Sequence, residues 1–476
     1  MSLSSALDTA KSSLIASQTH TALVSRNIAN LNDPSATRKY ANVVTGIGGR
    51  VEIASIARSQ NAVLYRNMLD STASVGAWSS MSAGYQRIDE VIGDTTLGRS
   101  PAARISDLAD ALAAFSANPG NPEFARAALD ASRELAGGLN ELATTVETVR
   151  RDADASLVAA AEDMNKLLAE IETLNDRVVS GTLAGTDVTD FVDRRDQAVT
   201  KLSEYVGVNA RIRGNNDLVL YTDSGVNLFD RTARQVEFTP TTPLVAGQPG
   251  ASFRIDGVVV TGEGSPMPVR SGSVLGLTML RDEVALTFGN QLDAIAGALV
   301  DAFAEQDAAG GFVNGLFTLK PGFTRDSAGL AGAIVVHQNA IDDPMLIRSG
   351  GISDEAVRPT PAQNAPGYNA RIEELVAKLG ESRDFTGKIG IEEKGTLASF
   401  AASSLGWLQA GRSAAMTETE YRTTLLERTQ ETLSNETGVN LATEMTLLTD
   451  LQRSYQASAR LISAVDEMLQ TLLQSV

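Results

Sequence analysis

Residues 441–476 read LATEMTLLTDLQRSYQASARLISAVDEMLQTLLQSV, and the prediction of the fold starts from this segment. Apolar or aromatic residues recur seven positions apart from Leu441 to Val476 without a break. Such a heptad repeat predicts a long helix with one narrow apolar stripe. The predicted C-terminal seam consists of Leu441, Met445, Leu448, Leu451, Tyr455, Ile462, Val465, Leu469, Leu472 and Val476.

A matching pattern lies at the opposite end of the chain. Spacings of three and four residues between residues 3 and 31 predict a second amphipathic helix, although Ser17 and Thr21 make the middle of its stripe polar. We expect the two terminal helices to pair in a coiled-coil-like arrangement. The predicted N-terminal seam consists of Leu3, Leu7, Leu14, Val24, Ile28 and Leu31.

Neither stripe has a second apolar layer to cover it within its own helix. A dozen apolar side chains contribute roughly 1.5–3 kcal/mol each if fully buried. Ordering each residue of such a helix costs about 1–2 kcal/mol in backbone entropy. These terms are comparable, so we expect the termini to be mobile in the free monomer and to become helical when subunits assemble. The alternative is an intramolecular coiled coil that is already folded in the monomer.

Composition excludes several classes of function. The 476 residues include 58 acidic and 40 basic side chains, which gives a net charge of −18. This balance argues against nucleic acid and anionic membrane surfaces as partners. The absence of cysteine excludes disulfides and thiolate metal sites, and only two histidines are present. We expect no cofactor, no bound metal and no catalytic site, and we also expect no cleaved secretory signal and no membrane insertion.

The interior predicts a rod rather than a compact enzyme. No proline interrupts residues 123–179, so one very long helix is expected there, unless Gly137 and Gly138 break it. Residues 211–268 are rich in Val, Thr, Gly and Pro and predict several short strands. The predicted fold is mainly α with a β-rich inserted domain, in an elongated multi-domain rod. The expected domains are a terminal helical pair (1–35 with 440–476), a long-helix bundle (36–208 with 273–439, including an irregular segment at 312–370) and a β-rich outer domain (209–272).

One group of regularly spaced aspartates is a candidate for a chemical role. Asp187, Asp190, Asp193 and Asp196 recur every third residue, which makes a calcium or general-acid role conceivable. The stretch lacks the central glycine and terminal glutamate of a calcium-binding helix–loop–helix. We therefore favour a helix N-terminus with surface ion pairs.

Short motifs at both ends resemble a known family. Residues 25–32 read SRNIANLN and resemble the N-terminal signature of bacterial flagellar rod, hook and hook-associated proteins, and residues 438–476 resemble the matching C-terminal end. Residues 174–208 and 291–310 are similar to the hook-associated protein 1 family in particular. One departure is NDPSATRKY at 32–40, which lacks the glycine usual in the family, so this loop is expected to take another path. The motif residues are Asn27, Ile28, Ala29, Asn30, Asn32, Gly438, Val439 and Asn440.

The resemblance implies a structural role in the bacterial flagellum. Members form a ring of subunits at the junction between hook and filament, so the expected partners are further copies of the chain, the hook protein and a second junction protein. The resemblance also implies export by the flagellar type III pathway, a chaperone on the C-terminal helix and a secreted, extracellular location. The alternatives are another axial subunit, such as a hook or flagellin-like protein, an exported enzyme on this scaffold, and a coiled-coil adhesin. The motif asparagines are expected to cap the first helix and fix its junction with the next segment, although a generic polar helix end is the simpler reading.

Overall fold

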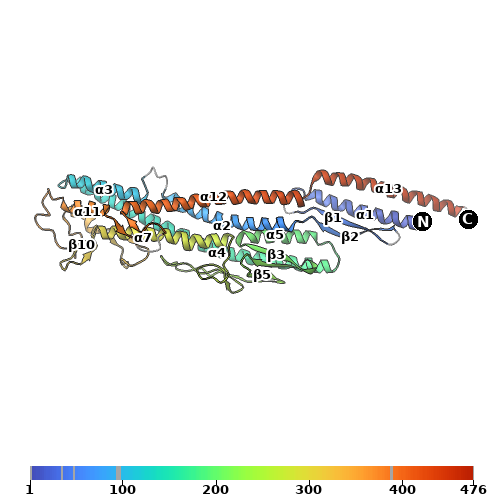
Figure 1. Cartoon of the computed structure of the whole chain (residues 1–476), viewed down its shortest axis with the longest axis horizontal. Coiled ribbons are helices and arrows are strands. Elements are labelled where there is room, and N and C mark those ends of the chain that lie inside the picture. Colours follow the sequence, from blue (N-terminus) through green and yellow to red (C-terminus); the bar gives the residue numbers. More distant parts are fainter. Residues whose placement is uncertain (1–2, 34–35, 47–48, 93–97, 386–389, 475–476) are drawn as a thin grey trace.

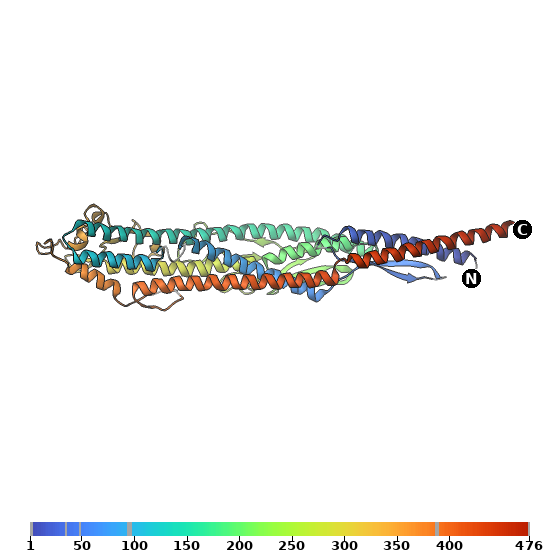
Figure 2. The same cartoon turned by 90° about the horizontal axis from the view of Figure 1, so that it is seen from above.

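The computed structural model describes residues 3–33, 36–46, 49–92, 98–385 and 390–474, without the side chains of Leu3, Ser4 and Leu472. The chain forms a long rod with both termini at its thinner end (Figures 1 and 2). Antiparallel strand ribbons lie along one side of the rod near its middle (Figure 1). The predicted fold class, a mainly helical elongated rod with a small β-rich part, is confirmed.

Long helices provide the length of the rod. The principal helices are α1 (Leu3–Ala29), α2 (Ala62–Ile92), α3 (Pro101–Ala117), α4 (Pro122–Leu183), α5 (Thr189–Tyr205), α7 (Ala285–Ala302), α11 (Ala370–Gly380), α12 (Leu397–Thr437) and α13 (Leu441–Gln474). Shorter helical pieces are η3 (Gly214–Asn216), α6 (Ser273–Met279), η4 (Leu280–Val284), α8 (Leu330–Ala333), α9 (Gln338–Asp342) and α10 (Leu346–Ser349).

The strands form small antiparallel sheets. A four-stranded sheet has the order β3 (Val208–Ile212), β4 (Leu218–Thr222), β5 (Asn227–Asp230) and β6 (Thr232–Ala233), and a three-stranded sheet has the order β7 (Val236–Glu237), β8 (Arg254–Ile255) and β9 (Val258–Val259). Two-stranded pairs are β1 (Lys39–Thr45) with β2 (Val51–Arg58), β10 (Glu305–Gln306) with β11 (Phe312–Val313), β12 (Phe317–Leu319) with β13 (Ile334–Val336), and β14 (Arg383–Asp384) with β15 (Lys394–Gly395).

Helix α4 is the longest element and runs unbroken through Gly137 and Gly138. The Asn121 side chain caps its first turn, and Pro122 occupies the first helical position, where no backbone donor is needed. Its 62 residues span about 93 Å at the usual rise per residue. The glycine pair does not end the helix because Gly138 is buried against the Arg104 side chain, so neighbouring packing outweighs the low helix propensity of glycine.

Two large apolar cores and one small cluster lie within the described part of the rod. The first joins the N-terminal half of α4 to α3, α7, α11 and the start of α12. The second joins the C-terminal half of α4 and α5 to the inner side of the β3–β6 and β7–β9 sheets. We refer to residues 62–437 as the body, and to α1, β1, β2 and α13 together as the terminal segment. The division into three domains stays a prediction.

The hairpin of β1 and β2 was missed at the level of sequence. Residues 36–208 were assigned to the predicted helical bundle, whereas strands within 39–58 pair in antiparallel register from Lys39 with Arg58 to Thr45 with Val51. The hairpin packs on α1 at the thin end of the rod (Figure 1).

Candidate functional site

The terminal helices α1 and α13 pack side by side and carry the predicted seams. The side chains buried between them include Leu23 and Val24 on α1, and Leu451 and Val465 on α13. Polar Ser17 and Ser458 are buried in the same contact, where apolar residues would be expected in a regular coiled coil. The pairing of the two ends therefore rests on a short and partly polar interface.

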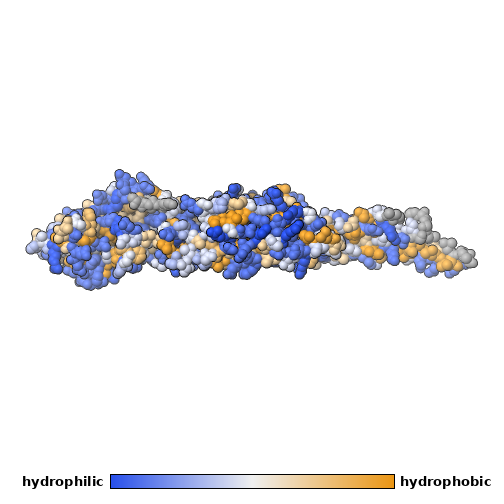
Figure 3. Space-filling view, turned by 90° about the horizontal axis from the view of Figure 1, so that it is seen from below, coloured by the Kyte–Doolittle hydropathy of each residue, from blue (hydrophilic) through white to orange (hydrophobic). Residues whose placement is uncertain are grey.

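Much of the predicted C-terminal seam lies at the surface of the single chain. Leu441 is 45% exposed, Met445 49% and Tyr455 41%, whereas Leu448, Ile462 and Leu469 are half-buried. Leu461, Met468 and Leu473 add further exposed apolar area to α13. Figure 3 shows hydrophobic residues exposed along this thin end of the molecule. Helix α1 thus covers only part of the apolar surface of α13.

The residues of the predicted N-terminal seam are likewise partly buried and partly exposed. Val24 is buried, Leu7, Leu14 and Ile28 are half-buried, and Leu31 is 38% exposed just beyond the end of α1. Val476 lies outside the described residues, as do the side chains of Leu3 and Leu472. Whether these seams form subunit interfaces stays a prediction.

Among the motif residues, Asn27 has the most contacts. Its amide oxygen accepts from the backbone N–H of Lys39 at 3.1 Å, and its Nδ2 donates to the Lys39 carbonyl at 2.8 Å. The same Nδ2 donates to Oε2 of Glu444 at 3.1 Å, and Arg38 Nε donates to the other carboxylate oxygen at 2.6 Å. Glu444 is fully buried in the first turn of α13, where a carboxylate also interacts favourably with the helix dipole. Asn27 therefore joins α1, β1 and α13 at one point.

The other motif residues have simpler positions. Asn30 donates its backbone N–H within the last turn of α1, and Asn32 is exposed. Gly438 and Val439 separate α12 from α13, and the Asn440 side chain accepts from the backbone N–H of Thr443 at 3.1 Å in the first turn of α13. The asparagine at 440 is thus a helix cap, while Asn27 connects separate elements rather than capping one.

An ion-pair cluster connects the terminal segment to the body, and we call it the ionic joint. Three cations of the terminal segment face four carboxylates on and just before α5. The cations are Arg26, Lys39 and Arg58, and the carboxylates are Asp187, Asp190, Asp193 and Asp196.

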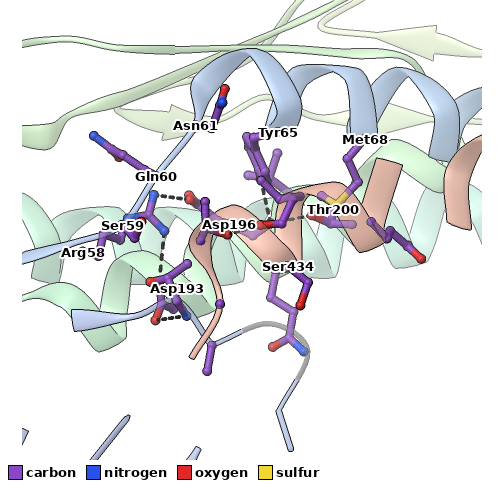
Figure 4. A pocket seen from close by; sticks show the side chains of 18 of the residues that line it. Arg58, Ser59, Gln60, Asn61, Tyr65, Met68, Asp193, Asp196, Thr200 and Ser434 are labelled. Atoms are coloured by element: carbon purple, nitrogen blue, oxygen red, sulfur yellow. Dashed lines mark hydrogen bonds and ion pairs between the residues drawn. The ribbon is translucent and has the colours of Figure 1, made fainter. Parts of the chain in front are cut away.

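The centre of the ionic joint is buried. Lys39 Nζ lies 2.5 Å from Asp190 Oδ1 and 3.0 Å from Asp193 Oδ2, and its side chain is only 2% exposed. Arg58 bridges Asp193 and Asp196 from the end of β2 (Figure 4). The interpretation of the carboxylates as ion-pair partners is confirmed, but their placement at the surface was wrong for Asp193, because the hairpin covers it.

The pKa of Asp187 is lowered from its ordinary value at the edge of the joint. Partial burial on its own would raise the pKa, but hydrogen bonds from Thr189 and Arg26 stabilise the ionised form and outweigh it. Asp187 also accepts from the Thr189 backbone N–H at 3.0 Å, which satisfies a free donor at the start of α5.

A groove of about 840 Å³ lies beside the ionic joint. It is lined by the chain after α1, the start of α2, α5 and the end of α12, and Figure 4 shows Arg58, Tyr65, Asp193 and Asp196 at its wall. Tyr65 donates its hydroxyl to the Asp196 carbonyl at 2.8 Å, and burial raises its pKa. These side chains are engaged with one another, so this part of the wall consists of structural contacts.

Within the described ranges, no group of His, Asp and Glu side chains is arranged to hold a metal ion. No helix in the described part of the chain is both long and apolar enough to cross a bilayer. The candidate site is therefore the exposed apolar surface of α13 at the thin end of the rod. Buried polar contacts hold the helices of this end in place.

Comparisons with known proteins agree with this architecture. The family described as "Flagellar hook-associated protein FlgK helical domain" matches residues 85–320, and "Flagellar basal body rod FlgEFG protein C-terminal" matches residues 430–475. In these regions the chain is similar to flagellar hook-associated protein 1. The two matched regions cover most of the helical body and nearly all of α13.

Individual relatives carry the same name at low identity. The flagellar hook-associated protein 1 of Escherichia coli K12 is 26% identical over 331 residues, which are 66% of this chain and 59% of that protein. The Salmonella typhimurium protein is 26% identical over 65% of this chain and 57% of its own length. The Bacillus subtilis protein is 24% identical over 99% of this chain and 98% of its own length. The chain thus spans somewhat under two thirds of the enterobacterial members that it matches.

Solved structures also match the chain. The flagellar hook junction protein FlgK from Burkholderia pseudomallei has a TM-score of 0.43 and 19% identity, over 53% of this chain and 46% of that one.

The cations of the ionic joint could not be predicted from the sequence pattern. Arg26, Lys39 and Arg58 lie far from the aspartates in sequence and follow no spacing that points to them. The available signal was charge alone, because several basic residues gather between 26 and 58 in a chain that is otherwise strongly acidic.

Proposed function

We propose that the chain is a structural subunit at the junction between the flagellar hook and the filament, and that it assembles through its terminal segment. The observation that carries the proposal is the apolar surface of α13 that α1 leaves uncovered. Similarity to flagellar hook-associated protein 1 supports the same role.

The physical argument concerns what would cover this surface. Leu441, Met445 and Tyr455 lie at the start and middle of α13, at positions where a neighbouring helix can pack against them. Each such side chain contributes roughly 1.5–3 kcal/mol when it passes from water into a full contact. Repetition of that contact between identical chains is favoured in a ring, since each copy presents the same surfaces.

The expected partners follow from this role. Further copies of the chain would form the ring, with the hook protein on one side and a second junction protein on the other. An export chaperone would cover the C-terminal helix before transit through the flagellar type III pathway, and the final location would be extracellular. The predicted mobility of the termini in the free monomer is separate from this proposal and stays a prediction. The chain would act as a building element rather than as an enzyme.

The direct test is an end-addition assay. Purified chain is mixed with isolated hooks from the same bacterium, and the hook ends are imaged by electron microscopy before and after filament subunits are supplied. We expect a cap on the hook ends that then accepts filament subunits. A folded chain that does not add to hook ends, or that adds equally well when Leu441, Met445 and Tyr455 are all changed to Ser, would contradict the proposal.

A further inference from the structure

The contact between the terminal segment and the body differs from every other large contact in the rod. The described apolar cores of the body begin at Met68 and end at Ala415, and none of their buried members comes from α1, the hairpin or α13. Among the described residues, the apolar cores of the body therefore do not extend into the terminal segment.

The ionic joint takes the place of that missing core. Lys39 and Arg58 belong to the hairpin, whereas Asp190, Asp193 and Asp196 belong to α5, so each of these pairs crosses the boundary. The Lys39 side chain is 2% exposed and the Asp193 side chain 9%, so water screens their attraction only weakly. Removal of one partner from such a buried pair leaves the other charge uncompensated, which is strongly unfavourable.

The terminal segment is also tied together internally. Asn27 binds both backbone polar groups of Lys39 and the carboxylate of Glu444, and Arg38 binds the same carboxylate. These bonds join α1, β1 and α13 to one another without any partner in the body. A change in the orientation of the segment can therefore leave its internal contacts intact.

The points at which the chain passes between the terminal segment and the body lie next to each other. The Arg38 backbone N–H donates to the carbonyl of Thr437 at 2.7 Å, and the Ser59 backbone N–H donates to the carbonyl of Arg38 at 2.7 Å. Thr437 is the last residue of α12, and Gly438 is in an extended conformation. The crossings thus form a compact pivot, and the ionic joint lies to one side of it, on α5.

We propose that the ionic joint fixes the angle between the terminal segment and the body, and that loss of its buried charges allows the segment to swing about the pivot at Thr437 as one unit. This inference rests on the geometry of the single chain and does not depend on the proposed function.

Pulsed electron–electron distance measurements test the proposal directly, because the chain contains no cysteine and accepts introduced labels without interference. Labels at Ala54→Cys on β2 and Thr173→Cys on α4 report on the angle across the joint. Labels at Ala54→Cys and Ala442→Cys report on the terminal segment alone, and labels at Asp107→Cys and Thr173→Cys report on the body alone. All four positions are exposed.

We expect the distribution of label distances across the joint to change and the other two distributions to stay the same. In the Lys39→Met and Asp193→Asn variants, the Ala54–Thr173 distribution should be broader than in the unaltered chain, while the other two distributions stay the same. The matched control is Arg87→Met, which removes an ion pair with Asp152 that lies wholly within the body. It should leave all three distributions unchanged.

Two results would overturn the proposal. The first is an Ala54–Thr173 distribution that is equally broad with and without the buried charges, because the joint would then not restrict the angle. The second is an equal broadening of the Ala54–Ala442 distribution, because the segment would then be unfolding rather than swinging. The body pair shows in the same samples that the variant is folded.

Discussion

Asn27 and Glu444 lie 417 positions apart in the chain and are joined by a buried hydrogen bond of 3.1 Å. The bond places the last turn of the first helix against the first turn of the last helix. It therefore fixes how the two ends of the chain meet, and the substitutions considered first act on this point.

Replacement of Asn27 by Ala should destabilise the terminal segment by about 1–3 kcal/mol, since Lys39 loses both backbone partners and Glu444 loses one donor in a buried position. Hydrogen exchange of α1 and α13 measures the effect. Asn32→Ala is the control, because Asn32 belongs to the same motif but is exposed. Equal protection in the two variants would show that Asn27 does not have this role.

Exposed and buried positions of α13 should respond differently to Ser. Met445→Ser and Tyr455→Ser remove side chains that are 49% and 41% exposed, so they should change the stability of the free chain little and weaken addition to hook ends. Leu451→Ser removes a buried side chain, so it should lower the stability of the α1–α13 contact itself, by about 2–5 kcal/mol if the site cannot collapse. Exchange protection and end addition, measured on the same samples, separate the two effects.

The lowered pKa of Asp187 predicts a dependence of stability on acid pH. Because its folded pKa lies below the ordinary 3.8, the ionised carboxylate stabilises the folded state above that pH. This contribution is lost as the pH falls through the folded pKa. The difference in unfolding free energy between the unaltered chain and Asp187→Asn should therefore shrink below pH 3.8, in denaturant titrations over a pH series. Parallel curves would contradict the assignment, and Asp107→Asn in α3 is the comparison.

Arg281 should be among the least replaceable residues of the body. Its buried guanidinium pairs with Asp154 and Asp282 and donates to the Ala251 carbonyl at 2.8 Å. Arg281→Met should destabilise the body by about 3–5 kcal/mol, because it leaves buried Asp154 without its charge partner. The double variant Arg281→Met with Asp154→Leu should lose less, as measured by chemical denaturation. A loss as large as the sum of the single changes would argue against the pair.

The two adjacent glycines of α4 should respond in opposite directions to Ala. A Cβ at Gly137 would meet no atom within 4 Å, so Gly137→Ala should stabilise the helix by about 0.5–1 kcal/mol. A Cβ at Gly138 would overlap the Arg104 guanidinium, so Gly138→Ala must displace that side chain and should lower the stability. Thermal unfolding of both variants gives the sign, and equal gains would show that Arg104 moves freely.

The sequence was sufficient for the features that depend on local pattern. The proline-free stretch 123–179 predicted most of the length of α4, because the breaks that end a helix are encoded within a few residues. No local pattern in residues 39–58 showed that these strands pair and cover Asp193.

The contacts that organise the thin end could not be predicted in this way. Arg26 pairs with Asp187 across 161 positions, and no spacing rule connects residues so far apart. The heptad at 441–476 correctly predicted a helix, but it did not show which half of the stripe α1 would cover. Which part of the apolar stripe is covered depends on how the two helices cross. It also depends on Glu444, which is buried at the start of the contact, where an apolar residue would be expected.

Helix α4 has one more consequence for how this architecture can vary. The continuous helix of 62 residues sets the distance between the pivot and the loops at the far end of the rod. Lengthening the rod would require matched additions in α4 and in the helices packed along it. Additions in the turn between β10 and β11, by contrast, change only what projects from the tip. Insertions in loops at the tip of the rod are therefore easier to accommodate than a change in the distance between its two ends.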